Sequence, residues 1–198
     1  MKTASPMRRS KAFNLPNLLT YFRLAAVPAV VGLLFWPEDH WSRWMALGVF
    51  AVAGVTDYLD GYFARVYAQQ SALGRMLDPI ADKLLVAACL LMLVADKTIH
   101  GWALWAAIVI LCREILVSGL REFLAELKVG VPVSRVAKWK TTAQIVAVGF
   151  LIAGPAGETV LPGTIMIGLV LLWVSAVLTI YTGWDYLKTG IQHMMDEG

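Results

Sequence analysis

The sequence predicts an all-α integral membrane protein, a bundle of about six transmembrane helices. Hydrophobic residues make up 59% of the 198-residue chain and charged residues only 16%, and the mean hydropathy is +0.66. A soluble domain of this length carries charge on about a quarter of its residues. The excess of apolar side chains must therefore face lipid. No repeat, low-complexity segment or linker divides the chain, and we expect one domain over residues 1–198.

The first two helices are expected at residues 17–36 and 42–66. Each apolar run is close to the ~20 residues that cross a bilayer. Residues 1–16 contain several basic side chains, so we expect this tract at the membrane interface, near anionic headgroups. The polar stretch 37–40 separates the two helices, and Gln and Ser residues at 69–71 follow the second.

The third helix is expected at residues 78–96, after a short polar loop that includes Gly74. Pro79 would then occupy the first turn of this helix, where its missing N–H costs nothing. The last three helices are expected at residues 101–126, 138–155 and 160–187, with glycine and proline in the two breaks between them.

Lysine and arginine gather on alternate connections. They precede the first helix and flank or crowd the second and fourth connections. The first, third and fifth connections hold only Arg43 and Lys97 between them. Because short cytoplasmic loops carry an excess of basic residues, both termini are expected in the cytoplasm, together with any site at the second connection.

Four aspartates at the second connection are the most informative polar feature. The neighbouring stretches 44–55 and 84–95 carry no charge at all. Ionisable groups at membrane depth are costly and are functional candidates. Four acids so close together would repel one another unless cations neutralise them, and carboxylates are preferred ligands of hard divalent metals. The alternatives are a charged helix end in the cytosol and interhelical salt bridges.

The spacing of the aspartates fits a two-metal site. Asp57 and Asp60 are three residues apart, and Asp78 and Asp82 are four apart, so each pair shares one face of a helix. Two antiparallel helices would then offer two carboxylates each to a common space. Two metals ~3.5–4 Å apart can clamp a diphosphate and stabilise the leaving oxygen of a phosphoryl transfer.

The full pattern around these acids resembles the signature of the CDP-alcohol phosphotransferase family at every defined position. The positions are Asp57-x2-Asp60-Gly61-x2-Ala64-Arg65-x8-Gly74-x3-Asp78-x3-Asp82. Family members are integral membrane enzymes that move a phosphatidyl or related group from a CDP-linked donor to an alcohol and release CMP. The resemblance implies two divalent ions, Mg²⁺ or Mn²⁺, and a homodimer.

The resemblance also implies roles for single residues. The metal ligands would be Asp57, Asp60, Asp78 and Asp82, and Asp82 would also be the catalytic general base toward the acceptor hydroxyl. The CDP part of the donor would be bound by Asp60, Gly61, Ala64, Arg65 and Gly74.

Two further segments, starting at Arg113 and Lys138, are similar to those of bacterial phosphatidylglycerolphosphate synthases. That similarity implies CDP-diacylglycerol as donor, sn-glycerol 3-phosphate as acceptor and a place in the bacterial inner membrane, with the active site facing the cytoplasm. A phosphorylated acceptor needs extra cations. The candidates for binding its phosphate are Arg113, Arg121, Lys138, Lys140 and Arg23.

Other interpretations of these cations stay open. Arg23 could pair with an acid instead of a phosphate, and Glu114 could orient the arginines. Lys138 and Lys140 point in nearly opposite directions on a helix, so one of them is expected to face headgroups. The whole set could also serve only to fix topology.

Other functions remain as alternatives to the glycerol-phosphate reaction. The same chemistry could use inositol phosphate, inositol or serine as acceptor. A cation transporter would need acids spread across the bilayer, whereas these acids cluster on one side, and a structural scaffold has no use for paired carboxylates. No nucleic-acid partner is expected.

Overall fold

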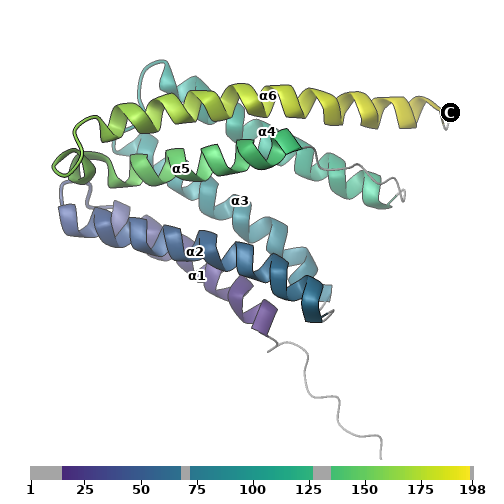
Figure 1. Cartoon of the computed structure of the whole chain (residues 1–198), viewed down its shortest axis with the longest axis horizontal. Helices are drawn as coiled ribbons and strands as arrows, with labels where there is room; N and C mark the ends of the chain where they lie inside the picture. The colour runs from purple at the N-terminus through teal and green to yellow at the C-terminus, as the bar shows by residue number, and fades with distance from the viewer. Residues whose placement is uncertain (1–14, 68–71, 127–134, 197–198) are drawn as a thin grey trace, which may run out of the picture.

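The computed structural model shows a bundle of six helices (Figure 1). It describes residues 15–67, 72–126 and 135–196; within these ranges, side chains are not described at 15–16, 57–67, 72–75, 126, 135, 137–138, 185–186 and 189–196. The helices are α1 (Leu15–Leu34), α2 (His40–Tyr67), α3 (Ala72–Ala95), α4 (Ala103–Glu126), α5 (Arg135–Glu158) and α6 (Thr164–Asp196). The predicted all-α bundle of six helices is thereby confirmed.

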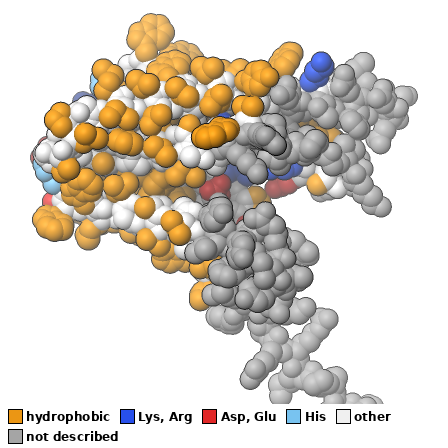
Figure 2. Space-filling model, viewed as in Figure 1, with side chains coloured by type: hydrophobic (Ala, Val, Ile, Leu, Met, Phe, Trp, Pro, Cys, Tyr) orange, Lys and Arg blue, Asp and Glu red, His pale blue; other side chains and the backbone are white. Residues whose placement is uncertain are grey.

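The described outer surface of the bundle is rich in large apolar side chains. Three helices, α1, α4 and α6, contain stretches long and apolar enough to cross a membrane, namely Asn17–Leu34, Ala103–Ala125 and Thr164–Trp184. Large side chains such as Ile115, Val177 and Ile180 are more than half exposed, and apolar side chains cover most of the described surface in Figure 2. Such an extended apolar surface suits lipid as the surrounding medium.

The predicted start of the third helix is wrong. Helix α3 begins at Ala72, six residues before the predicted start, so Gly74 lies within the helix and not in a loop. Pro79 lies inside α3 and not in its first turn. A proline there removes one helical N–H donor. The carbonyl left without a helical donor is that of residue 75, and membrane helices tolerate such a loss where neighbouring groups satisfy the freed backbone.

The helices form two groups of three. Helix α1 packs against α2 and α3, and α6 packs against α4 and α5; the contact between α2 and α5 joins the groups, with smaller contacts from α3 to α4 and α5. Successive helices run in opposite directions (Figure 1). We call the end at which α2 ends and α3 begins the motif end, and the opposite end the far end.

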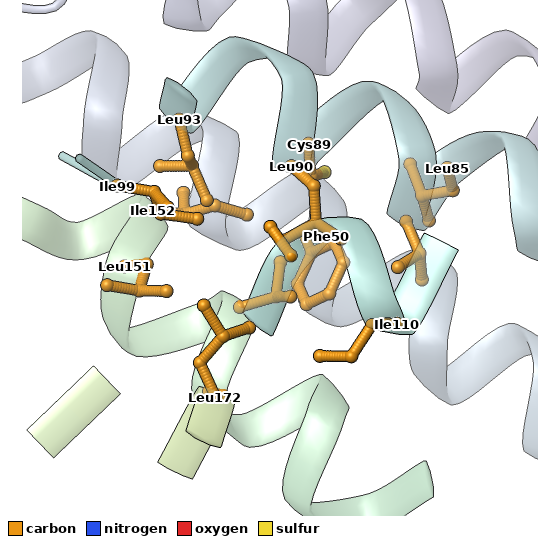
Figure 3. Close-up of a cluster of buried hydrophobic side chains, with 14 of the residues drawn as sticks. Phe50, Leu85, Cys89, Leu90, Leu93, Ile99, Ile110, Leu151, Ile152 and Leu172 are labelled. Carbon is orange, nitrogen blue, oxygen red and sulfur yellow. The ribbon is translucent and has the colours of Figure 1, made fainter. Parts of the chain in front are cut away.

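A continuous apolar core fills the space between the two groups. Figure 3 shows Phe50 of α2 beside Leu85, Cys89 and Leu90 of α3 and Ile110 of α4. Helix α5 contributes Leu151 and Ile152, and α6 contributes Leu172. This core occupies the far half of the bundle.

Arg43 joins two connections and helix α5 at the far end. Its side chain is 1% exposed, and its Nε donates to the Pro37 carbonyl at 2.9 Å. Its Nη2 donates to the carboxylate of Asp96 and, at 3.4 Å, to the hydroxyl of Thr98. The sequence placed Arg43 among the charges of the first connection, whereas the structure buries it inside α2.

Arg43 also completes the hydrogen bonding of α5, which is kinked at Gly154 (φ +43°) ahead of Pro155. The kink and the missing prolyl N–H leave carbonyls of α5 without helical donors. The carbonyl that Pro155 leaves without a helical donor is that of Leu151; the Arg43 Nη1 donates to it at 3.5 Å and to the neighbouring carbonyl of Ile152 at 3.2 Å. A Cβ at Gly154 would lie 2.5 Å from this Nη1 atom, so glycine is needed both for the positive φ and for the close approach.

Glu158 closes the turn between α5 and α6. Its carboxylate accepts hydrogen bonds from the N–H of Gly163 at 2.7 Å and of Ile165 at 2.8 Å. These are N–H groups that the start of α6 would otherwise leave without acceptors. The hydrogen bonds from Ile165 and then Gly163 lower the pKa of Glu158 below its ordinary value.

Candidate active site

The signature segment spans the end of α2 and the first half of α3. The backbone of Asp57 and Asp60 lies in the last turns of α2, and Asp78 and Asp82 lie in α3. Several predicted site residues have side chains outside the described part of the chain: Asp57, Asp60, Gly61, Ala64, Arg65, Gly74 and Lys138.

Asp78 is held from helix α1. Its Oδ1 atom accepts hydrogen bonds from the hydroxyl of Thr20 and from Nη2 of Arg23, the latter at 3.2 Å. The Arg23 side chain is 1% exposed, whereas that of Asp78 is 25% exposed. A buried arginine therefore reaches an aspartate that keeps part of its surface open at the motif end. In this structure Arg23 thus pairs with an acid, a contact that its sequence allowed beside phosphate binding.

The polar residues of α1 form a single stripe. Asn17, Thr20 and Arg23 are spaced by three residues, and each is about 1% exposed. Sequence analysis singled out Arg23 but gave Thr20 no role. The signal was present, because polar residues at a spacing of three share one helix face in an otherwise apolar helix.

A second polar group lies between α4, α5 and α6, and we call it the cationic cluster: Arg113, Glu114, Lys140 and Thr182. The Lys140 ammonium donates to Glu114 Oε1, to which Arg113 Nη1 also donates at 3.4 Å. Arg113 Nη2 donates to the Thr182 hydroxyl at 3.0 Å. Glu114 therefore contacts both cations, in keeping with the orienting role expected for it.

Glycine allows Arg113 to approach α6 closely. A Cβ at Gly183 would lie 3.2 Å from Arg113 Cγ, tighter than ordinary van der Waals contact. Thr182 and Gly183 were not found from the sequence, because a single Thr-Gly pair in an apolar helix carries no signal until the facing helix is known.

The cationic cluster lies next to the acids of the signature. The negative charge of Asp82 acts on the Lys140 ammonium, and α3 packs against both α4 and α5. Figure 2 shows acidic and basic side chains beside one another in a recess of an otherwise apolar face. The fold thus brings carboxylates and cations from distant parts of the sequence into one polar region.

The predicted acceptor-binding cations differ in their surroundings. Lys140 is 4% exposed and faces the interior, and Arg113 is largely buried. Arg121 lies two turns beyond Arg113 on α4 and is exposed. Of the two lysines between which the sequence could not decide, Lys140 faces the polar region, and the side chain of Lys138 lies outside the described residues.

Three further polar atoms are buried near the middle of the bundle. Gln144 Oε1, Ser175 Oγ and Thr179 Oγ1 make no hydrogen bond within the part of the chain that the structure describes. An unsatisfied buried polar group costs about 1–3 kcal/mol. Gln144 lies in the segment starting at Lys138 that the sequence singled out. Ser175 and Thr179 did not stand out, because a lone hydroxyl in a membrane helix commonly bonds to its own backbone.

The chemistry of the signature acids fits hard divalent cations. Carboxylate oxygens are the ligands that Mg²⁺ and Mn²⁺ prefer, and the two hydrogen bonds on Asp78 use Oδ1 and leave Oδ2 for a cation. Among the described side chains, no three His, Cys, Asp or Glu residues form a metal-binding group. Of the four predicted ligands, only Asp78 and Asp82 have side chains within the described part of the chain.

Two hollows on the described surface are apolar and lie away from this region. One lies between α2 and α5 and includes Trp44 and Phe150; the other lies beside α6 and includes Trp173. Neither contains a predicted site residue, so neither is a candidate for the phosphoryl-transfer centre.

Comparison with known proteins places these features in a family. The sequence profile described as CDP-alcohol phosphatidyltransferase matches residues 13–181. A protein of Cereibacter sphaeroides is 36% identical over 218 residues, covering 93% of this chain and 99% of its own length. One of Rickettsia bellii is 44% identical over 175 residues, with coverages of 88% and 94%. One of Pseudomonas fluorescens is 40% identical over 190 residues, with coverages of 93% and 94%. All three are named CDP-diacylglycerol–glycerol-3-phosphate 3-phosphatidyltransferase.

Proposed function

Because this chain belongs to the CDP-alcohol phosphatidyltransferase family, we propose that it transfers the phosphatidyl group of CDP-diacylglycerol to sn-glycerol 3-phosphate. The products are phosphatidylglycerol phosphate and CMP. The observation that carries this acceptor is the cationic cluster: Lys140 and Arg113 are largely buried, both donate to Glu114, and the helices that bear them, α5 and α4, pack against α3 of the signature. A phosphate on the acceptor explains why buried cations are needed next to a site built from carboxylates.

Asp57, Asp60, Asp78 and Asp82 would hold two divalent ions, Mg²⁺ or Mn²⁺. When bound, such ions neutralise the carboxylates and the donor diphosphate and polarise the phosphorus under attack. The donor's cytidine diphosphate would lie against Asp60, Gly61, Ala64, Arg65 and Gly74. The small residues let the nucleotide approach the α2 backbone, and the Arg65 guanidinium can donate to phosphate oxygens. The acyl chains of the donor would stay in the bilayer.

Asp82 would accept the proton of the attacking acceptor hydroxyl. The hydroxyl oxygen forms a bond to the phosphorus that carries the diacylglycerol, and the bond from that phosphorus to the oxygen of CMP breaks. The leaving CMP takes the electron pair of the broken bond, and the proton passes to Asp82. A general base must lie within hydrogen-bond reach of the proton that it removes.

Arg113, Arg121, Lys138 and Lys140 would bind the acceptor phosphate, with Arg23 contributing from α1 next to Asp78. Glu114 would orient Arg113 and Lys140 through the contacts that it makes with both. A neutral acceptor such as inositol or serine would offer no anionic group to the buried cations Arg113 and Lys140. Inositol phosphate carries the same anionic group and is the acceptor that the test must separate from glycerol 3-phosphate.

The chain is embedded in a membrane, and we propose that this is the bacterial inner membrane. The placement of Lys and Arg puts both termini and the active site on the cytoplasmic side, where both water-soluble reactants would be available. The family resemblance favours a homodimer, and the whole chain would act as one domain.

The decisive experiment is a purified preparation supplied with labelled CDP-diacylglycerol and a panel of acceptors. We expect CMP release with glycerol 3-phosphate in the presence of Mg²⁺ or Mn²⁺, and none after chelation. CMP release with inositol phosphate but not with glycerol 3-phosphate would assign inositol phosphate as the acceptor. Full activity in chelator would contradict the two-metal mechanism.

A further inference from the structure

Helix α1 supplies two donors to one oxygen of Asp78, although α1 contains no residue of the signature. The Thr20 hydroxyl and the Arg23 Nη2 both donate to Oδ1, and neither uses Oδ2. Thr20 and Arg23 are three residues apart and share one face of α1. Both are about 1% exposed, so the donors come from the interior while the carboxylate keeps exposed surface.

This arrangement is the one that outer-shell partners make with metal-binding side chains. A hydrogen bond to one part of a ligand fixes the direction in which its remaining donor atom points. With Oδ1 occupied from two sides, rotation of the Asp78 carboxylate about its side-chain bonds would break at least one contact. The Oδ2 atom is thereby held in a preset direction before any metal arrives.

We propose that Thr20 and Arg23 are positioning residues that preset Asp78 for a divalent ion. The inference rests on the proposed function, in which Asp78 is a metal ligand. Neither residue touches the metal in this account. A carboxylate that must first be ordered binds a metal ion more weakly. By holding Asp78 in place beforehand, Thr20 and Arg23 would raise the affinity for the divalent ion.

The test is Mn²⁺ binding to the purified full-length protein without substrates, with free Mn²⁺ followed by electron paramagnetic resonance. Thr20→Val keeps the shape of the side chain and removes the hydroxyl. We expect it to raise the Mn²⁺ dissociation constant by about 10- to 100-fold, the usual effect of losing an outer-shell partner. Thr20→Ser restores the hydroxyl and should bind Mn²⁺ almost as the wild type does.

Thr179→Val is the matched control. Thr179 is also a fully buried helical threonine, and its hydroxyl makes no hydrogen bond within the described part of the chain. The same chemical change at this position should leave the Mn²⁺ dissociation constant unchanged. If Thr20→Val fails to fold, Arg23→Lys carries the test, because it keeps a positive charge beside Asp78 but loses the guanidinium geometry; it should also weaken Mn²⁺ binding.

Two negative outcomes are distinguishable. If Thr20→Val and Arg23→Lys bind Mn²⁺ as the wild type does, the positioning role is refuted even where the unfolding temperature falls, and the proposed function stands. If the wild type binds no Mn²⁺, or if Asp78→Asn binds it equally well, the metal assignment of the proposed function is itself refuted.

Discussion

Among the described side chains, Arg23 and Arg43 are almost fully buried, and each pairs with an aspartate of α3 or next to it. At the far end, Arg43 and Asp96 are 1% and 3% exposed, and Arg43 also donates to backbone carbonyls of Pro37 and Ile152. At the motif end, Arg23 is equally buried, but its partner Asp78 is 25% exposed.

The difference shows how one kind of ion pair can serve two purposes. The far-end pair is enclosed, and its hydrogen bonds join two connections to the kinked part of α5. The motif-end pair is closed on the arginine side and open on the aspartate side. An accessible carboxylate such as that of Asp78 can bind a further cation, whereas the enclosed carboxylate of Asp96 can only stabilise the fold.

The largest expected effect separates the two aspartates. Asp78→Asn should abolish nearly all CMP release while the protein still folds, because a metal ligand is lost. Losing an outer-shell partner already costs about 10- to 100-fold, so losing the ligand should cost more. Asp96→Asn is the matched change at the far end, and its folded fraction should keep the wild-type specific activity. Equal losses per folded molecule would refute the division of roles.

Next in size is the effect of breaking the far-end pair. Arg43→Met leaves Asp96 buried without its cation and the carbonyl of Ile152 without its donor. Removal of one partner of a buried ion pair costs about 3–5 kcal/mol, so we expect a large fall in the free energy of unfolding in detergent. Lys188→Gln, which removes an exposed charge on α6, should change it little. An unaltered unfolding transition in Arg43→Met would contradict the bracing role.

A smaller effect should distinguish cations that serve substrate from Arg43. Arg113→Gln should raise the KM for glycerol 3-phosphate by roughly 10- to 100-fold, since a charge-assisted hydrogen bond contributes about 1.5–3 kcal/mol. The KM for CDP-diacylglycerol should change little. Initial rates with each substrate varied at saturating levels of the other measure both constants. An unchanged acceptor KM in both Arg113→Gln and Lys140→Gln would leave the cationic cluster with a structural role only.

The smallest effect concerns pH at the far end. Hydrogen bonds from Ile165 and Gly163 lower the pKa of Glu158 below its ordinary value of about 4.5. A lowered folded-state pKa stabilises the protein above the ordinary value, and this contribution is lost as the pH falls through the folded-state pKa. Wild type should therefore be more stable than Glu158→Gln at about pH 7, with the difference shrinking below about pH 4.5. Denaturant titrations of both proteins at several pH values would reveal the trend, and a constant difference would refute it.

Much of the fold was predictable because it depends on local properties. Long apolar runs between polar breaks predicted six helices, and the six observed helices overlap each predicted range. The start of α3 was mispredicted because proline is a strong signal for a helix start in isolation. In the bundle, α3 continues through Pro79, because a membrane helix that packs against its neighbours tolerates an internal proline.

The partners of the polar side chains were much less predictable. The sequence offered two interpretations for Arg23 and did not choose between Lys138 and Lys140. On sequence alone, Arg43 counted only among the basic residues that indicate membrane orientation. The groups that decide these cases, such as Asp78 for Arg23 and Glu114 for Lys140, lie on other helices and far along the chain.

The sequence by itself determined that this protein is a helical membrane protein of one family, because hydropathy and the spacing of the signature are properties of a single stretch of chain. Only the tertiary structure decided which cation meets which acid. Interhelical pairs depend on how helices rotate and pack against one another, and packing of the apolar faces sets that rotation. The same packing buried Arg43 beside Asp96 and left Asp78 partly exposed. It thereby separated an ion pair that stabilises the bundle from the candidate active site.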